Sequence, residues 1–182
     1  MDIVNLLERS YQDTTSVLER IPPEGYAAPS PCSGWTVREV GEHLVGSITR
    51  LAVLVEGGTG DQPEDPGTDL TAGFRAAAKR SVAAFSAPDA LQRRYPFGPG
   101  PTPGLVLANL CLTESLVHGW DLAQGTGLPY PADDAVVAAV HGFAGQAVGD
   151  EQRRAGHFGP AYPTGSGTDP LTALLAHLGR RS

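Results

Sequence analysis

The sequence predicts an all-α protein: a four-helix bundle with long crossover loops, followed by one or two additional C-terminal helices. Long segments place apolar side chains three or four residues apart, which is the spacing of a helix with one buried face. Pro and Gly concentrate between these segments. The length of 182 residues suits one domain over residues 1–182, with the bundle in about 1–127 and the C-terminal helices and tail in about 128–182.

The first two helices are defined by their ends as well as by their apolar faces. The first runs from about Asp2 to Ile21 and stops at a Pro-Pro pair, because proline interrupts helical hydrogen bonds. An extended loop is expected over residues 22–35. The second helix begins at Thr36, since Thr36 and Glu39 have the spacing of a capping box, and it closes at a Gly-Gly pair.

A polar connector over residues 57–68 leads to the third helix, near residues 69–87. The Pro- and Gly-rich residues 88–103 cannot be helical, and we expect a short extended segment there that lines a rim. The fourth helix then starts with Pro103 in its first turn and ends at Gly125 or Gly127. It is apolar on nearly every side, which indicates a central, buried helix.

Two helices are expected after the bundle. The first, over about residues 132–148, has Asp133 and Asp134 in its first turn, where the helix dipole favours carboxylates. An irregular stretch follows over residues 149–167. Asp169 followed by Pro170 then has the pattern of a cap that opens a last short helix.

The composition argues against several classes of function. A net charge of −7 disfavours nucleic acid as a partner, because phosphates require a basic surface. No apolar run has the length of a membrane span, and the N-terminus lacks the pattern of a secretory signal. We therefore expect a cytoplasmic protein without membrane contact, in which Cys32 and Cys111 remain reduced thiols.

Polar side chains interrupt the apolar fourth helix along one stripe. Glu114, His118 and Asp121 fall within about 60° of one another at 100° per residue. Buried polar groups need partners, and a Glu and a His four residues apart can reach one divalent metal ion. A local hydrogen bond between Glu114 and His118 is the simpler alternative. Asp121 either orients the imidazole or forms a local cap or pair.

His43 lies in the middle of the second helix, on the flank of its apolar stripe. Alone, such a histidine is more often a satisfied polar residue than a ligand. Facing helices of a bundle are nevertheless where ligands converge. The combination of His43 with Glu114 and His118 therefore favours a metal centre.

Other side chains have weaker claims to a functional role. Cys111 is either a soft metal ligand or, more commonly, a small buried apolar residue. Cys32 is expected to be structural, and Trp35 and Trp120 are expected in the core. Glu39 is accounted for by its capping box.

The remaining basic residues and histidines carry little information. Arg93 and Arg94 either clamp a substrate carboxylate or stay solvated. Three further histidines have no partner at ligand spacing: His141, His157 and His177.

Two stretches of the chain resemble a known family. They are Pro31-Cys-Ser-Gly-Trp-Thr-Val-Arg-Glu-Val-Gly-Glu-His-Leu-Val-Gly46 and Glu114-Ser-Leu-Val-His-Gly-Trp-Asp-Leu-Ala123. They closely resemble the signatures of the mycothiol-dependent maleylpyruvate isomerase N-terminal-type domain, within the DinB-like superfamily. Phe158-Gly-Pro and the tail Leu174-Leu-Ala-His-Leu-Gly179 look like the closing segment of a metal-binding subgroup.

The resemblance implies a DinB-like four-helix bundle with a long crossover. It implies a divalent metal, typically zinc and in some relatives nickel, held by His, Glu and His. Carried over position by position, the ligands are His43, Glu114 and His118. Three protein ligands leave an open position, which is the mark of a reactive site.

The resemblance also implies chemistry with a low-molecular-weight thiol of the mycothiol type. The partners would be that thiol and an electrophilic substrate, in an S-transfer or an isomerisation. Isomerase members have a further C-terminal domain that helps to build the substrate site, so we expect a thiol S-transferase to suit the lone bundle better. The alternative is a non-catalytic metal-binding structural or interaction protein, with a homodimer left open.

Overall fold

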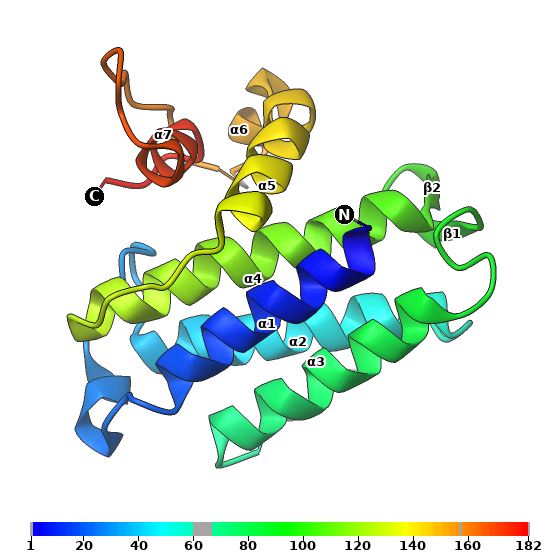
Figure 1. Ribbon diagram of the computed structural model, residues 1–182, viewed down its shortest axis with the longest axis horizontal. Helices are drawn as coiled ribbons and strands as arrows, with labels where there is room; N and C mark the ends of the chain where they lie inside the picture. Colours follow the sequence, from blue (N-terminus) through cyan, green and yellow to red (C-terminus); the bar gives the residue numbers. More distant parts are fainter. Residues whose placement is uncertain (1, 60–66, 157, 182) are drawn as a thin grey trace.

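The computed structural model describes residues 2–59, 67–156 and 158–181. It is mostly helical, as the sequence predicts, and four long helices lie side by side (Figure 1). Their bounds are Ile3–Leu18 for α1, Val37–Val55 for α2, Leu70–Ser86 for α3 and Gly104–Thr126 for α4. Helix α1 packs against α3 and α4, and α2 packs against the same two helices.

The apolar faces of these helices meet in one cluster of buried side chains. Leu7 of α1, Leu44 of α2, Phe74 of α3 and Leu112 of α4 are fully buried in it. Helix α4 is buried along most of its length, as its apolar sequence predicts. Helix α1 ends three residues earlier than predicted, because the chain leaves the helix in a turn in which Arg20 N donates to Val17 O.

Helix α2 begins with the predicted capping box. The Thr36 hydroxyl accepts from Glu39 N at 3.3 Å, and Thr36 N donates to a carboxylate oxygen of Glu39 at 2.7 Å. The preceding loop contains a 3-10 helix, η1 (Pro23–Ala27), that the sequence analysis missed. The loop then pairs Pro29 with Thr36 and lies against α4, where a Cβ on Gly125 would be 3.1 Å from Pro29 O.

The expected extended segment between α3 and α4 is an antiparallel hairpin of β1 (Arg94–Phe97) and β2 (Gly100–Pro103). It lies at the N-terminal end of α4 (Figure 1). The predicted connector over residues 57–68 falls largely on residues 60–66, outside the described residues.

Three further helices lie together on the α4 side of the long helices (Figure 1). They are α5 (Asp134–Ala147), α6 (Asp150–Arg154) and α7 (Pro170–His177). Helix α5 packs on α4 and α1, and α7 packs on α5. The predicted caps are present, because the Asp133 carboxylate accepts from Ala135 N and the Asp169 carboxylate accepts from Leu171 N.

Helix α6 lies in the stretch predicted to be irregular. Five residues are too short for an apolar period, although acidic residues in its first turn and basic residues in its last suit the helix dipole.

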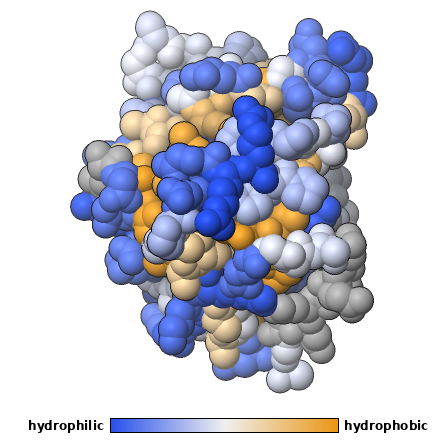
Figure 2. All heavy atoms as spheres, turned by 90° about the vertical axis from the view of Figure 1, so that its right-hand side faces the viewer, coloured by the Kyte–Doolittle hydropathy of each residue, from blue (hydrophilic) through white to orange (hydrophobic). Residues whose placement is uncertain are grey.

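Within the described part of the chain, no helix combines the length and the apolar character needed to cross a bilayer. Figure 2 shows the end of the molecule where the hairpin lies, with apolar residues in separate areas between hydrophilic ones. Apolar atoms normally make up about half of a protein surface, so separate apolar areas of this kind are ordinary.

Candidate metal centre

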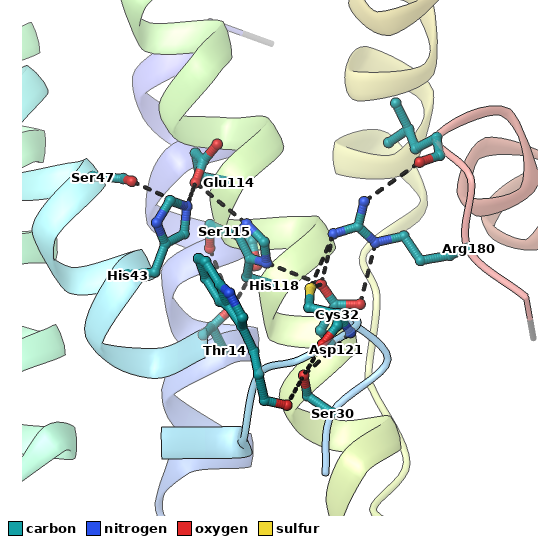
Figure 3. A network of polar contacts seen from close by, with 12 residues as sticks. Thr14, Ser30, Cys32, His43, Ser47, Glu114, Ser115, His118, Asp121 and Arg180 are labelled. Atoms are coloured by element: carbon teal, nitrogen blue, oxygen red, sulfur yellow. Dashed lines mark hydrogen bonds and ion pairs between the residues drawn. The ribbon is translucent and has the colours of Figure 1, made fainter. Parts of the chain in front are cut away.

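The three predicted ligands meet between α2 and α4 (Figure 3). His43 Nε2 lies 3.2 Å from Oε2 of Glu114, and His118 Nε2 lies 3.5 Å from the same oxygen. The two imidazole rings are edge to face, with centroids 5.0 Å apart. One potential ligand atom from each of the three residues lies within 4.8 Å of the other two. The four-residue spacing of Glu114 and His118 and the packing of α2 on α4 together produce a compact group of two nitrogens and one oxygen.

The carboxylate of Glu114 lies at the centre of this group. Its Oε2 is buried, and no donor among the described residues makes a well-aligned hydrogen bond to it. Burial acts to raise the pKa of Glu114, but the contact with His43 and the charges of the two imidazoles hold it below its ordinary value. A buried, ionised oxygen that faces two imidazole nitrogens fits a divalent cation, which prefers such ligands.

His118 is oriented by Asp121, one turn further along α4. Its Nδ1 lies 2.9 Å from Oδ2 of Asp121, which is fully buried. If Nδ1 carries a proton, it donates that proton to Asp121, and Nε2 is left facing Glu114. The structure therefore shows Asp121 in contact with the imidazole of His118.

Arg180 completes the surroundings of Asp121, and the sequence analysis missed it. Its Nη2 donates to Oδ2 at 2.9 Å and its Nε donates to Oδ1 at 3.2 Å. Burial acts to raise the pKa of Asp121, but the hydrogen bonds from His118 and Arg180 hold it below the ordinary value. Helical spacing relates residues on the same helix only, so it cannot predict that Arg180, which follows α7, contacts Asp121 on α4.

The Cys32 thiol also donates to Oδ2 of Asp121, at 3.2 Å. Burial, together with the negative charge of Asp121, raises the pKa of Cys32 to about 12, so the sulfur stays protonated. Cys32, His118 and Asp121 form a second group with ligand atoms within 4.8 Å. Arg180 already balances the charge of that group, which makes it a hydrogen-bond network rather than a cation site.

Residues 7–123 match the family model of the mycothiol maleylpyruvate isomerase N-terminal domain. The chain belongs to this family. The matched region contains both motif stretches, with His43, Glu114, His118 and Asp121, whereas Arg180 lies outside it.

Two uncharacterised proteins of Mycobacterium tuberculosis, from strains CDC 1551 and H37Rv, are similar to the chain over nearly its whole length. Each is 29% identical over 184 residues, which cover 99% of this chain and 98% of the relative. No solved structure gives a significant match. The family name points to a mycothiol-related domain, while these relatives add no activity.

The two tryptophans of this family member differ in their surroundings. Trp120 is buried as predicted, but Trp35 is 39% exposed, and its placement in the core was wrong. The Trp35 ring lies edge-on to His43, with centroids 5.0 Å apart. A turn in which Trp35 N donates to Cys32 O, and Ser30 N donates to Trp35 O, presents the indole at this rim. The His43 side chain is itself 38% exposed, so the group opens to solvent here.

The other candidates belong to neither ligand group among the described residues. Cys111 is fully buried, and burial raises its pKa to about 12, as expected for a small core residue. Arg94 donates to Pro101 O within the hairpin, at 2.9 Å. Arg93 directly precedes that hairpin, and its carbonyl oxygen accepts from Gly104 N, at the first residue of α4, at 2.8 Å. His177 contacts Ala144 O, and His157 lies outside the described residues.

Proposed function

We propose that the chain binds a divalent metal ion through His43, Glu114 and His118. The observation that supports this most directly is the convergence of two Nε2 atoms on the buried Oε2 of Glu114, which has no aligned donor among the described residues. Zn²⁺ is the proposed ion and Ni²⁺ the alternative, because both accept imidazole and carboxylate ligands.

The proposed activity is low-molecular-weight-thiol chemistry, either S-transfer from a mycothiol-type thiol to an electrophilic substrate or an isomerisation. A bound divalent ion supplies Lewis acidity, which lowers the pKa of a coordinated thiol or water. Asp121 holds the His118 ring, and the half-exposed side of His43 beside Trp35 is where a small molecule would approach. Family membership supports this choice of chemistry.

The proposal extends to architecture and location. Helices α1–α4 would form a DinB-like four-helix bundle with long crossovers, supported by their packing around one core. Residues 1–182 would be one domain, because the same cluster extends from Ile3 to Leu178. A cytoplasmic protein without nucleic-acid or membrane partners agrees with the net charge of −7. A homodimer stays a prediction, which light scattering of the purified protein tests.

The deciding experiment is elemental analysis of protein that has been stripped with a chelator and refilled with Zn²⁺ or Ni²⁺. We expect close to one ion per chain, and a loss of that ion in His43→Ala, Glu114→Ala and His118→Ala. The matched control is His141→Ala, since His141 is exposed on α5 and belongs to neither ligand group. Sub-stoichiometric metal in the refilled wild type would refute the proposal.

Thiol chemistry is tested separately on the refilled protein. Consumption of a thiol with an electrophilic acceptor should disappear in His43→Ala and persist in His141→Ala. Stoichiometric metal without turnover across a panel of thiols and acceptors would favour the non-catalytic alternative.

A further inference from the structure

Arg180 joins the C-terminal segment to the centre of α4. Its guanidinium binds both oxygens of Asp121, and its side chain is only 15% exposed while that of Asp121 is fully buried. Figure 3 shows it entering from the side opposite His43. A planar guanidinium that binds a carboxylate through two donors fixes the orientation of that carboxylate more tightly than a single hydrogen bond.

The fold of the C-terminal segment directs Arg180 to this position. Leu174 and Leu178 are fully buried, so α7 is anchored in the core. At its end Gly179 has a φ of +83°, and Arg180 N donates to Leu175 O at 2.8 Å. A Cβ on Gly179 would lie 2.8 Å from the Cα of Gly159, so this turn also needs glycine for space.

Asp121 connects Arg180 to His118. Its Oδ2 accepts from Arg180, from the Cys32 thiol and from His118 Nδ1, while Oδ1 accepts from Arg180 Nε. Without the guanidinium, this buried carboxylate would keep only contacts through Oδ2 and could rotate. The imidazole would then lose the partner that holds its proton on Nδ1 and its Nε2 towards Glu114.

We propose that Arg180 is a positioning residue of the metal centre, acting through Asp121 on His118. The C-terminal segment around α7 thereby completes a site whose ligands all lie on α2 and α4, and it does so from outside the region that defines the family. This inference rests on the proposed metal binding, although its effect on the imidazole is independent of the metal.

The first test compares the Zn²⁺ affinity of the wild type, Arg180→Gln and Arg180→Lys by competition with a chromophoric chelator. We expect affinity to fall by about 10-fold in Arg180→Gln, the lower end of the range for direct partners of ligand histidines, because Arg180 acts only through Asp121. The loss in Arg180→Lys should be smaller, because lysine keeps the charge but not the two-donor fork. The control is Arg181→Gln, since Arg181 lies over the Tyr162 ring rather than against Asp121.

The second test records ¹⁵N NMR shifts of the His118 ring in metal-free protein, at a pH high enough to keep the imidazole neutral. The wild type should show one tautomer with the proton on Nδ1, and Arg180→Gln a mixture, whereas the control Arg181→Gln should retain one tautomer. If Arg180→Gln does not fold, Arg180→Lys takes its place in both tests.

The two proposals fail in different ways. Unchanged Zn²⁺ affinity in the Arg180 variants of a wild type that binds metal overturns this inference alone. A wild type that binds no metal overturns the proposed function. The tautomer of His118 then tests the role of Arg180, and a single tautomer in the Arg180 variants refutes that role.

Discussion

His118 Nδ1 and Asp121 Oδ2 lie 2.9 Å apart, one turn from each other on a helix whose middle is buried. This contact ties the candidate ligand to a carboxylate that is also paired with Arg180. The charge of Asp121 therefore serves two neighbours at once, and removing it should affect both the metal centre and the folded state.

Asp121→Asn should weaken Zn²⁺ binding and destabilise the fold together. The variant leaves the guanidinium of Arg180 largely buried without its carboxylate, which costs about 3 kcal/mol for a broken buried ion pair. Metal affinity should fall by about 10- to 100-fold. Urea unfolding of metal-free protein measures the first effect, and chelator competition the second.

The control for Asp121→Asn is Asp134→Asn, because Asp134 is an exposed carboxylate in the first turn of α5. Its effect on unfolding should stay within about 0.5 kcal/mol. Equal effects of the two substitutions would show that Asp121 has no special part in the fold.

Much of this arrangement follows from local sequence chemistry. Helical periodicity and end signals predict the long helices, and Thr36 with Glu39 predicts where α2 starts. Glu114 and His118 are recognised because a helix converts a spacing of four residues into neighbours. The position of His43 in the middle of the second helix and the family resemblance both indicate it as the third ligand, and the packing of α2 on α4 brings it to the other two.

The missed features depend on tertiary contacts. Arg180 pairs with Asp121 across 59 positions of the chain, and no periodicity encodes such a contact. Trp35 looks like a core residue by its type, yet backbone hydrogen bonds of its turn place the indole at the rim. The short helix α6 contains no apolar period to detect.

Trp35→Ala and Trp120→Ala should differ sharply in stability. Trp120 is 6% exposed, so its truncation leaves a cavity and should cost about 3–5 kcal/mol. Trp35 is 39% exposed, and its truncation should cost clearly less than that of Trp120 while the protein still binds metal. Denaturant unfolding and metal content measure these outcomes. A destabilisation by Trp35→Ala as large as that by Trp120→Ala would contradict the rim position.

The contribution of Glu39 to stability should depend on pH. Hydrogen bonds from the backbone and side chain of Thr36 lower the pKa of Glu39 below its ordinary value of 4.5. A carboxyl whose pKa is lower in the folded state stabilises the fold above its unfolded pKa, and this stabilisation is lost as the pH falls through the folded pKa.

The wild type should therefore be more stable than Glu39→Gln above pH 4.5, and the difference should shrink as the pH falls below that value. Thermal unfolding of both proteins across this range measures the change. A difference that does not vary with pH would show that the charge of Glu39 has no part in the cap.

Gly119→Ala tests how closely the rest of the protein packs against α4 beside His118. A Cβ at this position would lie 2.4 Å from the Thr14 hydroxyl and 2.8 Å from the Tyr130 ring. Alanine favours a helix over glycine, but the clash with α1 and with the chain before α5 should outweigh this preference, and the variant should lose about 1–3 kcal/mol of stability.

Gly142→Ala is the matched control, because nothing lies within 4 Å of its Cβ, and it should gain about 0.5–1 kcal/mol of stability. The two substitutions should thus shift the urea midpoint in opposite directions, and a shift in the same direction would mean that the neighbours of Gly119 yield easily. Because Gly119 directly follows His118, we also expect Gly119→Ala, but not Gly142→Ala, to weaken Zn²⁺ binding in the chelator competition.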